Sequence, residues 1–156
     1  MPRIISSQPA TSRPKLLALS QIDNDWETIA EAPDYSVPDP TLRWPNDRDP
    51  ANASRRIQAG QAIITTPLFV HNAGVEAPVT VFVRVLTQQD EEAVQARIEV
   101  PAGETYMHPC AGITLVKDDL TAEAGDRLQV RASAAAAPVH ISFAVAIGAA
   151  DQDQPA

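Results

Sequence analysis

The chain has little of what would tie a small domain together covalently or bind nucleic acid. A single cysteine, Cys110, excludes an intrachain disulfide, so stability must come from packing or from partners. There are 12 Lys and Arg against 20 Asp and Glu, and the net charge of -8 argues against direct binding to nucleic acid, which requires clustered basic residues. At 156 residues, the chain has the size of one domain with one modest core.

Long apolar runs are also missing. Residues 1–14 include basic side chains but no apolar stretch of the kind found in a signal peptide, and no window approaches a transmembrane span. We therefore expect a protein that is made in the cytoplasm, is not exported through a signal peptide and is not inserted in a membrane.

Proline is abundant, with 14 residues in the chain, most of them before residue 68. Each proline fixes its backbone angle and lacks a donor, so residues 34–50 are predicted to run as an irregular, extended strap. Large apolar side chains in and before this strap would be costly to leave in water, because burying one contributes on the order of 2–3 kcal/mol. These side chains, which include both tryptophans, are Trp26, Ile29, Tyr35, Val37, Leu42 and Trp44.

The chain divides into three predicted segments: an extended N-terminal arm at 1–60, a β-module at 61–148 and a polar tail at 149–156. The arm can wrap its own module and supply part of its core, or it can dock on a neighbouring subunit, and both can hold in one assembly. Within the arm, the short runs Lys15–Leu19 and Glu27–Ala30 fit edge strands.

The module consists of runs in which apolar and polar residues alternate, as in half-buried strands. The clearest run is Val79–Val85, in which every second residue is valine. After the acidic turn Asp90–Glu92, the run Val94–Val100 alternates in the same way, which predicts a hairpin between the two. Further strands are predicted at Leu128–Ala132 and Val139–Ile147.

The opening run of the module, Ala62–Val70, contains Pro67, which predicts an edge strand or a bulged one. Later, Ile113, Leu115 and Val116 are expected to plug one end of the core. With short turns and no amphipathic helix, the pattern predicts an all-β fold, an antiparallel β-sandwich or jelly-roll-like module preceded by an extended proline-rich N-terminal arm.

Several phrases of the module then support a family resemblance. They are the strand end Phe69–Asn72, the turn Val100–Thr105 (VPAGET), the segment Ala124–Ala134 (AGDRLQVRASA) and the strand Val139–Phe143. With them, residues 62–147 resemble the small β-sandwich structural proteins of tailed bacteriophages and related particles, in which such phrases mark successive turn-to-strand junctions. The resemblance implies a virion part, on a capsid, neck, tail or fibre.

We therefore expect a non-enzymatic structural protein of a tailed-phage particle, located in the virion, that assembles through its arm and its sandwich surface. Its partners would be other copies of itself, as a homo-oligomer, and other virion structural proteins. The predicted partner-binding residues are Trp26, Tyr35, Val37, Leu42 and Trp44. No catalytic residue, cofactor or metal ligand is predicted.

An enzyme is the less favoured alternative. His108 and Cys110 are close in sequence, and a neighbouring loop can bring His71 to them. The paired spacings of zinc sites, however, are absent. The simpler assignments are a small buried apolar group for Cys110, a turn residue for His71 and an exposed strand residue for His140. The acidic pair Asp118 and Asp119, like the acidic turn after the first long strand, fits solvated loops better than a glycosidase or calcium site.

The main rival is a receptor- or carbohydrate-binding sandwich at a fibre tip. Sugar sites usually present exposed aromatic platforms, and the module offers only Phe69, Phe82, Tyr106 and Phe143, three of which fall on predicted strands. This scarcity counts against the rival.

Overall fold

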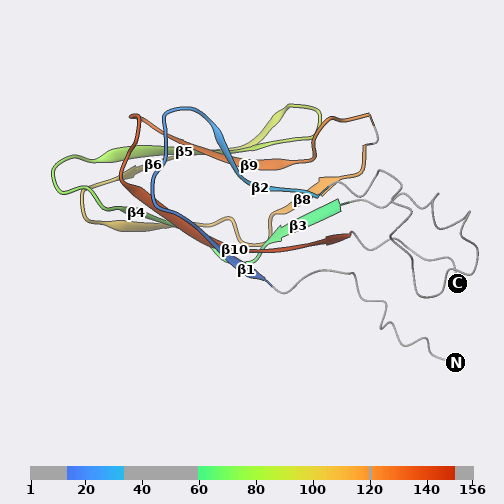
Figure 1. Cartoon of the computed structure of the whole chain (residues 1–156), viewed down its shortest axis with the longest axis horizontal. Helices are drawn as coiled ribbons and strands as arrows, with labels where there is room; N and C mark the ends of the chain where they lie inside the picture. Colours follow the sequence, from blue (N-terminus) through green and yellow to red (C-terminus); the bar gives the residue numbers. More distant parts are fainter. Residues whose placement is uncertain (1–13, 34–59, 120, 150–156) are drawn as a thin grey trace, which may run out of the picture.

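The computed structural model describes residues 14–33, 60–119 and 121–149, and these form two antiparallel sheets that lie one over the other (Figure 1). This part of the chain contains ten strands and no helix, so none of its segments is a helix able to cross a membrane. The predicted all-β fold with two antiparallel sheets is confirmed.

The six-stranded sheet is organised around β10, the longest strand. On one edge β10 pairs with β1, and on the other it pairs with β3 and β4, which lie end to end. Outside these two, β8 pairs with β3 and β7 pairs with β4. The strands are β1 (Lys15–Leu19), β3 (Gly60–Ile64), β4 (Leu68–Asn72), β7 (Thr105–His108), β8 (Thr114–Lys117) and β10 (Val139–Ala149).

The break between β3 and β4 falls at Pro67. The opening run is therefore two strands in the interior of the sheet, interrupted at the proline, and it is not an edge strand. Thr66 bridges the gap, because its Oγ1 accepts a hydrogen bond from the backbone N–H of Ala144 at 2.8 Å. A side-chain oxygen here takes the place of a ladder carbonyl.

The second sheet has four strands in the order β2 (Glu27–Glu31), β9 (Arg127–Ala132), β5 (Val79–Leu86) and β6 (Glu92–Val100). The predicted hairpin between β5 and β6 is confirmed, with Val81 opposite Ile98 and Val83 opposite Ala96.

The core lies between the two sheets and follows the predicted alternation. All four valines of β5 are buried, and the residues between them are half-buried. Leu128 and Val130 of β9 face Phe143 and other buried residues of β10 in the same apolar cluster. Of the residues expected to plug one end, Leu115 is fully buried and Ile113 packs against the core, while Val116 lies on the other face of β8 and is half-buried.

The described part of the predicted arm, residues 14–33, lies within the sandwich. The runs predicted as edge strands are confirmed, because among the described strands β1 pairs with β10 alone and β2 with β9 alone. Between them, Ile22 is fully buried and forms a bridge with Ala137, so this part of the arm supplies core. Residues 34–59, which include the predicted strap at 34–50, and residues 150–156 of the predicted tail lie outside the described residues.

Pro33 and Gly60, the described residues on either side of positions 34–59, lie against each other in the fold. The backbone of Gly60 lies so close to Pro33 that a Cβ on the glycine would sit 1.5 Å from the Pro33 carbonyl oxygen. Gly60 also pairs with Ala149, the last residue of β10. Pro33, Gly60 and Ala149 thus lie together at one end of the sandwich.

Candidate functional site

The structure does not bring the histidines, Cys110 and the acidic pairs together into one reactive site. Cys110 is buried, as its assignment as a small apolar group predicted, with its sulfur 3.9 Å from the Thr66 carbonyl oxygen. Burial raises the pKa of its thiol, and a backbone hydrogen bond with Leu68 acts in the opposite direction. Within residues 14–33, 60–119 and 121–149, no three His, Cys, Asp or Glu side chains gather closely enough to hold a metal ion.

The histidines are placed by the strands that carry them. His140 is an exposed residue of β10, as predicted. The assignment of His71 to a turn is wrong, because β4 extends through it and pairs it with His140 and Thr105. Its Nδ1 lies 2.7 Å from the Thr105 Oγ1, and the two imidazole rings are 5.9 Å apart. Burial lowers the pKa of His108, at the end of β7.

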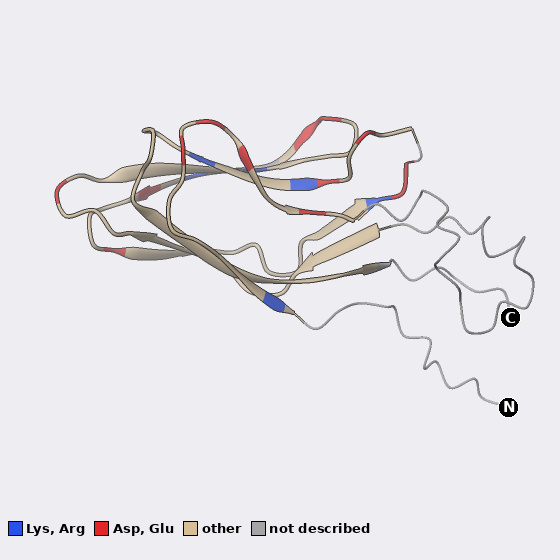
Figure 2. Ribbon diagram, viewed as in Figure 1, with Lys and Arg blue, Asp and Glu red and all other residues tan. Residues whose placement is uncertain are grey.

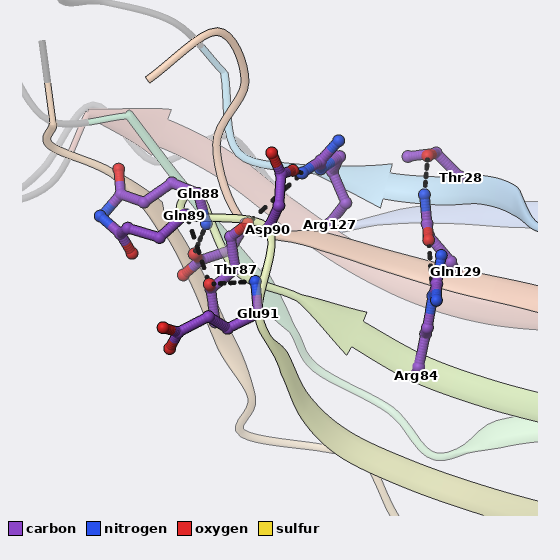
Figure 3. A network of polar contacts seen from close by, with 10 residues as sticks. Thr28, Arg84, Thr87, Gln88, Gln89, Asp90, Glu91, Arg127 and Gln129 are labelled. Carbon is purple, nitrogen blue, oxygen red and sulfur yellow. Dashed lines mark hydrogen bonds and ion pairs between the residues drawn. The ribbon is translucent and has the colours of Figure 1, made fainter. Parts of the chain in front are cut away.

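The acidic groups belong to a polar network that connects two loops. Gln88 accepts hydrogen bonds at Oε1 from the backbone N–H groups of Asp118 and Asp119. Asp90 pairs with Arg127 at 2.6 Å (Figure 3). Hydrogen bonds from Thr121 and Gln89 lower the pKa of Asp119. These carboxylates are therefore used in holding the loops together.

The outer face of the six-stranded sheet carries exposed apolar side chains in register. Phe69 lies opposite Met107 on one side and Ser142 on the other, and Ser142 lies opposite Ala18. Leu16, two residues before Ala18 on β1, faces the same way. Leu16 is 74% exposed, Met107 64% and Phe69 37%. We call Leu16, Ala18, Phe69 and Met107 the apolar row.

The outer face of the four-stranded sheet is basic and aromatic. Phe82 in the middle of β5 lies opposite Arg97 of β6 and Arg131 of β9. The Arg131 guanidinium lies 4.0 Å from the centre of the Phe82 ring and 5.1 Å from that of Trp26, and the Arg84 guanidinium lies 4.1 Å from Trp26. We call Trp26, Phe82, Arg84, Arg97 and Arg131 the arginine face. A groove of about 560 Å³ lies over it.

A row of hydrogen bonds fixes the position of Arg84. Its Nε donates to the Oε1 of Gln129 at 2.8 Å, and Gln129 in turn donates from Nε2 to the Thr28 Oγ1 at 3.0 Å (Figure 3). Its second nitrogen, Nη1, forms an ion pair with Glu92 at the rim of the groove. Gln129 points outward, as its alternation predicts, but it is buried because β2 and Arg84 cover it.

Only one of the predicted partner-binding residues lies in the described chain. Trp26, just before β2, packs against Arg84 and Arg131 of its own chain. Tyr35, Val37, Leu42 and Trp44 lie outside the described residues, so their role stays a prediction.

The sequence pattern predicts the apolar row and the arginine face only in part. Alternation placed Phe82 and Arg84 on one side of β5, and Arg131 on the outward side of β9. It did not say which strands are neighbours, and cross-strand register is what brings the three together. For the apolar row, the available signal was Leu16 and Met107 on the side of their strands away from the core.

Comparison of the chain with models of known protein families and with curated protein sequences finds no match.

Proposed function

We propose that this chain is a non-enzymatic structural protein of a tailed-phage particle, a capsid decoration, neck or tail/fibre component. It attaches to copies of itself and to other virion proteins through the apolar row and its arm. The proposal rests on the apolar row. The face of a sheet that contacts water is usually polar, whereas this face exposes Leu16, Phe69 and Met107. The resemblance of the turn phrases to phage sandwich proteins supports the choice of particle.

The energetics favour contact with another protein. Covering a leucine, methionine or phenylalanine side chain contributes roughly 1–2 kcal/mol when it is partly exposed beforehand. The row lies on β1, β4 and β7, which strand pairing holds rigidly, so little conformational entropy is lost on binding. A flat, stiff apolar face of this kind suits sheet-to-protein packing in an assembly.

The predicted strap offers a second attachment. Pro33, Gly60 and Ala149 lie at one end of the sandwich, whereas the apolar row lies on a broad face. Tyr35 and Trp44 belong to the predicted strap, which follows Pro33 in the sequence. The sandwich can be held by its face while the strap contacts a neighbour.

The test compares incorporation into particles. The full chain and the variants Leu16→Lys and Met107→Lys are expressed in cells that produce the particles, and the chain in purified particles is quantified by mass spectrometry. Val75→Lys is the matched control, because Val75 is 90% exposed but lies in the loop before β5.

We expect the wild-type chain and the Val75 control at equal levels, and the two row variants reduced at least about tenfold, the loss expected from removing one or two well-buried apolar contacts. Absence of the wild-type chain from the particles would overturn the virion assignment. Incorporation of both row variants at the wild-type level would overturn the apolar row as the assembly surface.

A further inference from the structure

We infer that the arginine face binds the carboxylate groups of an extended acidic peptide supplied by a partner protein. The inference does not depend on the proposed particle, because it concerns the opposite face of the sandwich and a different kind of contact. It rests on the distribution of charge, on guanidinium donors that nothing in the described chain uses, and on the spacing of the strands.

Lys and Arg side chains are concentrated on this face, which also carries the exposed Glu99 two residues after Arg97, although the chain as a whole has a net charge of -8. The Lys and Arg of the described residues are Lys15, Arg84, Arg97, Lys117, Arg127 and Arg131. Three of these, Arg84, Arg97 and Arg131, line the groove over the arginine face, and Glu92 is the one acidic residue that lines it. Figure 2 shows most of the blue segments on the four-stranded sheet.

The three arginines are not equivalent. Arg84 is engaged by Gln129 and Glu92, so it is part of the floor of the groove. Arg131 is held in place by stacking on Phe82, yet among the described residues neither Arg131 nor Arg97 donates a hydrogen bond to a protein acceptor. Stacking orients a guanidinium without using its N–H groups, which remain free for a ligand.

The free groups match carboxylates. A guanidinium presents parallel N–H donors that fit the two oxygens of a carboxylate, and such charge-assisted pairs are stronger than neutral hydrogen bonds. Arg97 and Arg131 sit on strands that flank β5, so their backbones are about 9.6 Å apart, twice the spacing of neighbouring strands. In an extended peptide, side chains at i and i+2 are about 6.6 Å apart, a distance that two long arginine side chains can bracket.

A peptide suits the groove better than a sugar. Carbohydrate sites stack a sugar ring on an uncovered aromatic ring, but Arg131 covers Phe82 and both Arg84 and Arg131 lie against Trp26. What the groove offers a ligand is therefore guanidinium donors. The groove also reaches β6, an edge strand of the sheet, along Gln95–Arg97.

The test measures binding of the full chain to a fluorescein-labelled octapeptide of alternating Asp and Ser, by fluorescence anisotropy in about 0.1 M salt. At this ionic strength charges farther than about 10 Å are largely screened, so repulsion from distant acidic residues is small. The same peptide with Asn in place of Asp serves as the ligand control. Variants Arg97→Gln and Arg131→Gln remove one guanidinium each, and Lys15→Gln makes the same charge change on β1.

We expect the Asp peptide to bind, the Asn peptide to bind at least about tenfold more weakly, and each arginine variant to lose about tenfold in affinity, as for a hydrogen bond to a charged group. Lys15→Gln keeps wild-type affinity. Arg131→Lys keeps the positive charge but loses the parallel N–H donors of the guanidinium. Its affinity for the Asp peptide should lie between those of wild type and Arg131→Gln.

Arg97 makes no ring or hydrogen-bond contact in the described chain, so Arg97→Gln tests the site even if Arg131→Gln lowers the melting temperature. Unchanged affinity of a folded Arg97→Gln variant would overturn the inference, as would equal binding of the two peptides or no binding at millimolar peptide. Arginine-dependent binding of an oligogalacturonate, without binding of the Asp peptide, would assign the site to an acidic glycan and refute the peptide.

Discussion

Asn72 donates a hydrogen bond from Nδ2 to the carbonyl oxygen of Val100 at 3.0 Å, and this bond joins the two sheets at the end of the sandwich opposite Gly60 and Ala149. Asn72 is fully buried at the end of β4, and Val100 ends β6. The second hydrogen of the same amide goes to the Ala77 carbonyl, and the Asn72 Oδ1 accepts from the backbone N–H of Gly74. Every polar atom of this side chain is thus satisfied inside the sandwich.

Replacing Asn72 should therefore be costly. Asn72→Ala leaves the buried Val100 carbonyl, the part-buried Ala77 carbonyl and the Gly74 backbone N–H without their partner, and we expect a loss of about 3 kcal/mol in the free energy of unfolding. Chemical denaturation followed by circular dichroism measures the change. Asn24→Ala, at an exposed position between β1 and β2, is the control and should lie within about 0.5 kcal/mol of wild type. A small loss for Asn72→Ala would contradict the assigned network.

The hydrogen bond between Thr66 and Ala144 should stabilise the interrupted strand. Thr66→Val keeps the shape of the side chain but removes the Oγ1 acceptor, so the Ala144 N–H of the central strand loses its partner. We expect a loss of about 1–3 kcal/mol in stability. The neighbouring Thr65→Val is the matched control: it removes only the exposed hydrogen bond that the Thr65 Oγ1 donates to the Ala144 carbonyl at 3.2 Å, and that carbonyl keeps the backbone N–H of Thr65 as a donor. Equal effects of the two substitutions would show that the bridge contributes nothing.

His108 predicts a pH dependence of stability. Burial lowers the pKa of this imidazole from 6.5, so between 6.5 and the lower folded value the unfolded chain binds more protons than the folded one. This contribution makes the sandwich less stable as pH falls below about 7, and it levels off below the folded pKa. His108→Gln should flatten the difference between unfolding free energies measured at pH 5 and pH 7.5. Superimposable profiles for the variant and wild type would contradict it.

Cys110 should react slowly in the native protein. Its side chain is 2% exposed and burial raises the pKa of its thiol, so both access and the thiolate fraction are reduced. With an excess of a disulfide reagent such as dithiobis(nitrobenzoate), we expect the native chain to react at least about 100-fold more slowly than the chain in urea. Rapid labelling without denaturant would mean that the loop after β7 opens readily.

Period-two alternation made much of the module predictable. The valines of β5 face the core because side chains point to opposite faces in turn, and the short acidic turn brings β6 back beside β5. The proline at position 67 predicted a disturbance in its strand, since it has no N–H for the ladder. It did not predict an interior position, because the side-chain acceptor of Thr66 that makes this position tolerable comes from the local backbone path.

The two surfaces depended on strand neighbours, which alternation does not specify. Gln129 appeared to be an ordinary outward residue, yet it is buried under Thr28, which lies far from it in the chain. Trp26 is predicted to contact a partner because it is large and apolar, and this stays a prediction; within its own chain it packs on arginines of β5 and β9. In each case the partner residue is set by the order of the sheet.

The sequence by itself determined the all-β class, the extent of most strands and the face of each strand that turns to the core, because these follow from local backbone geometry and from the burial of every second side chain. The tertiary structure decided that β1 and β2 complete the two sheets, that Leu16 and Met107 share one outer face, and that Arg97 and Arg131 flank Phe82 on the other. Those relationships join residues distant in the chain, and only the pairing of strands across the sheet brings them within reach of one another.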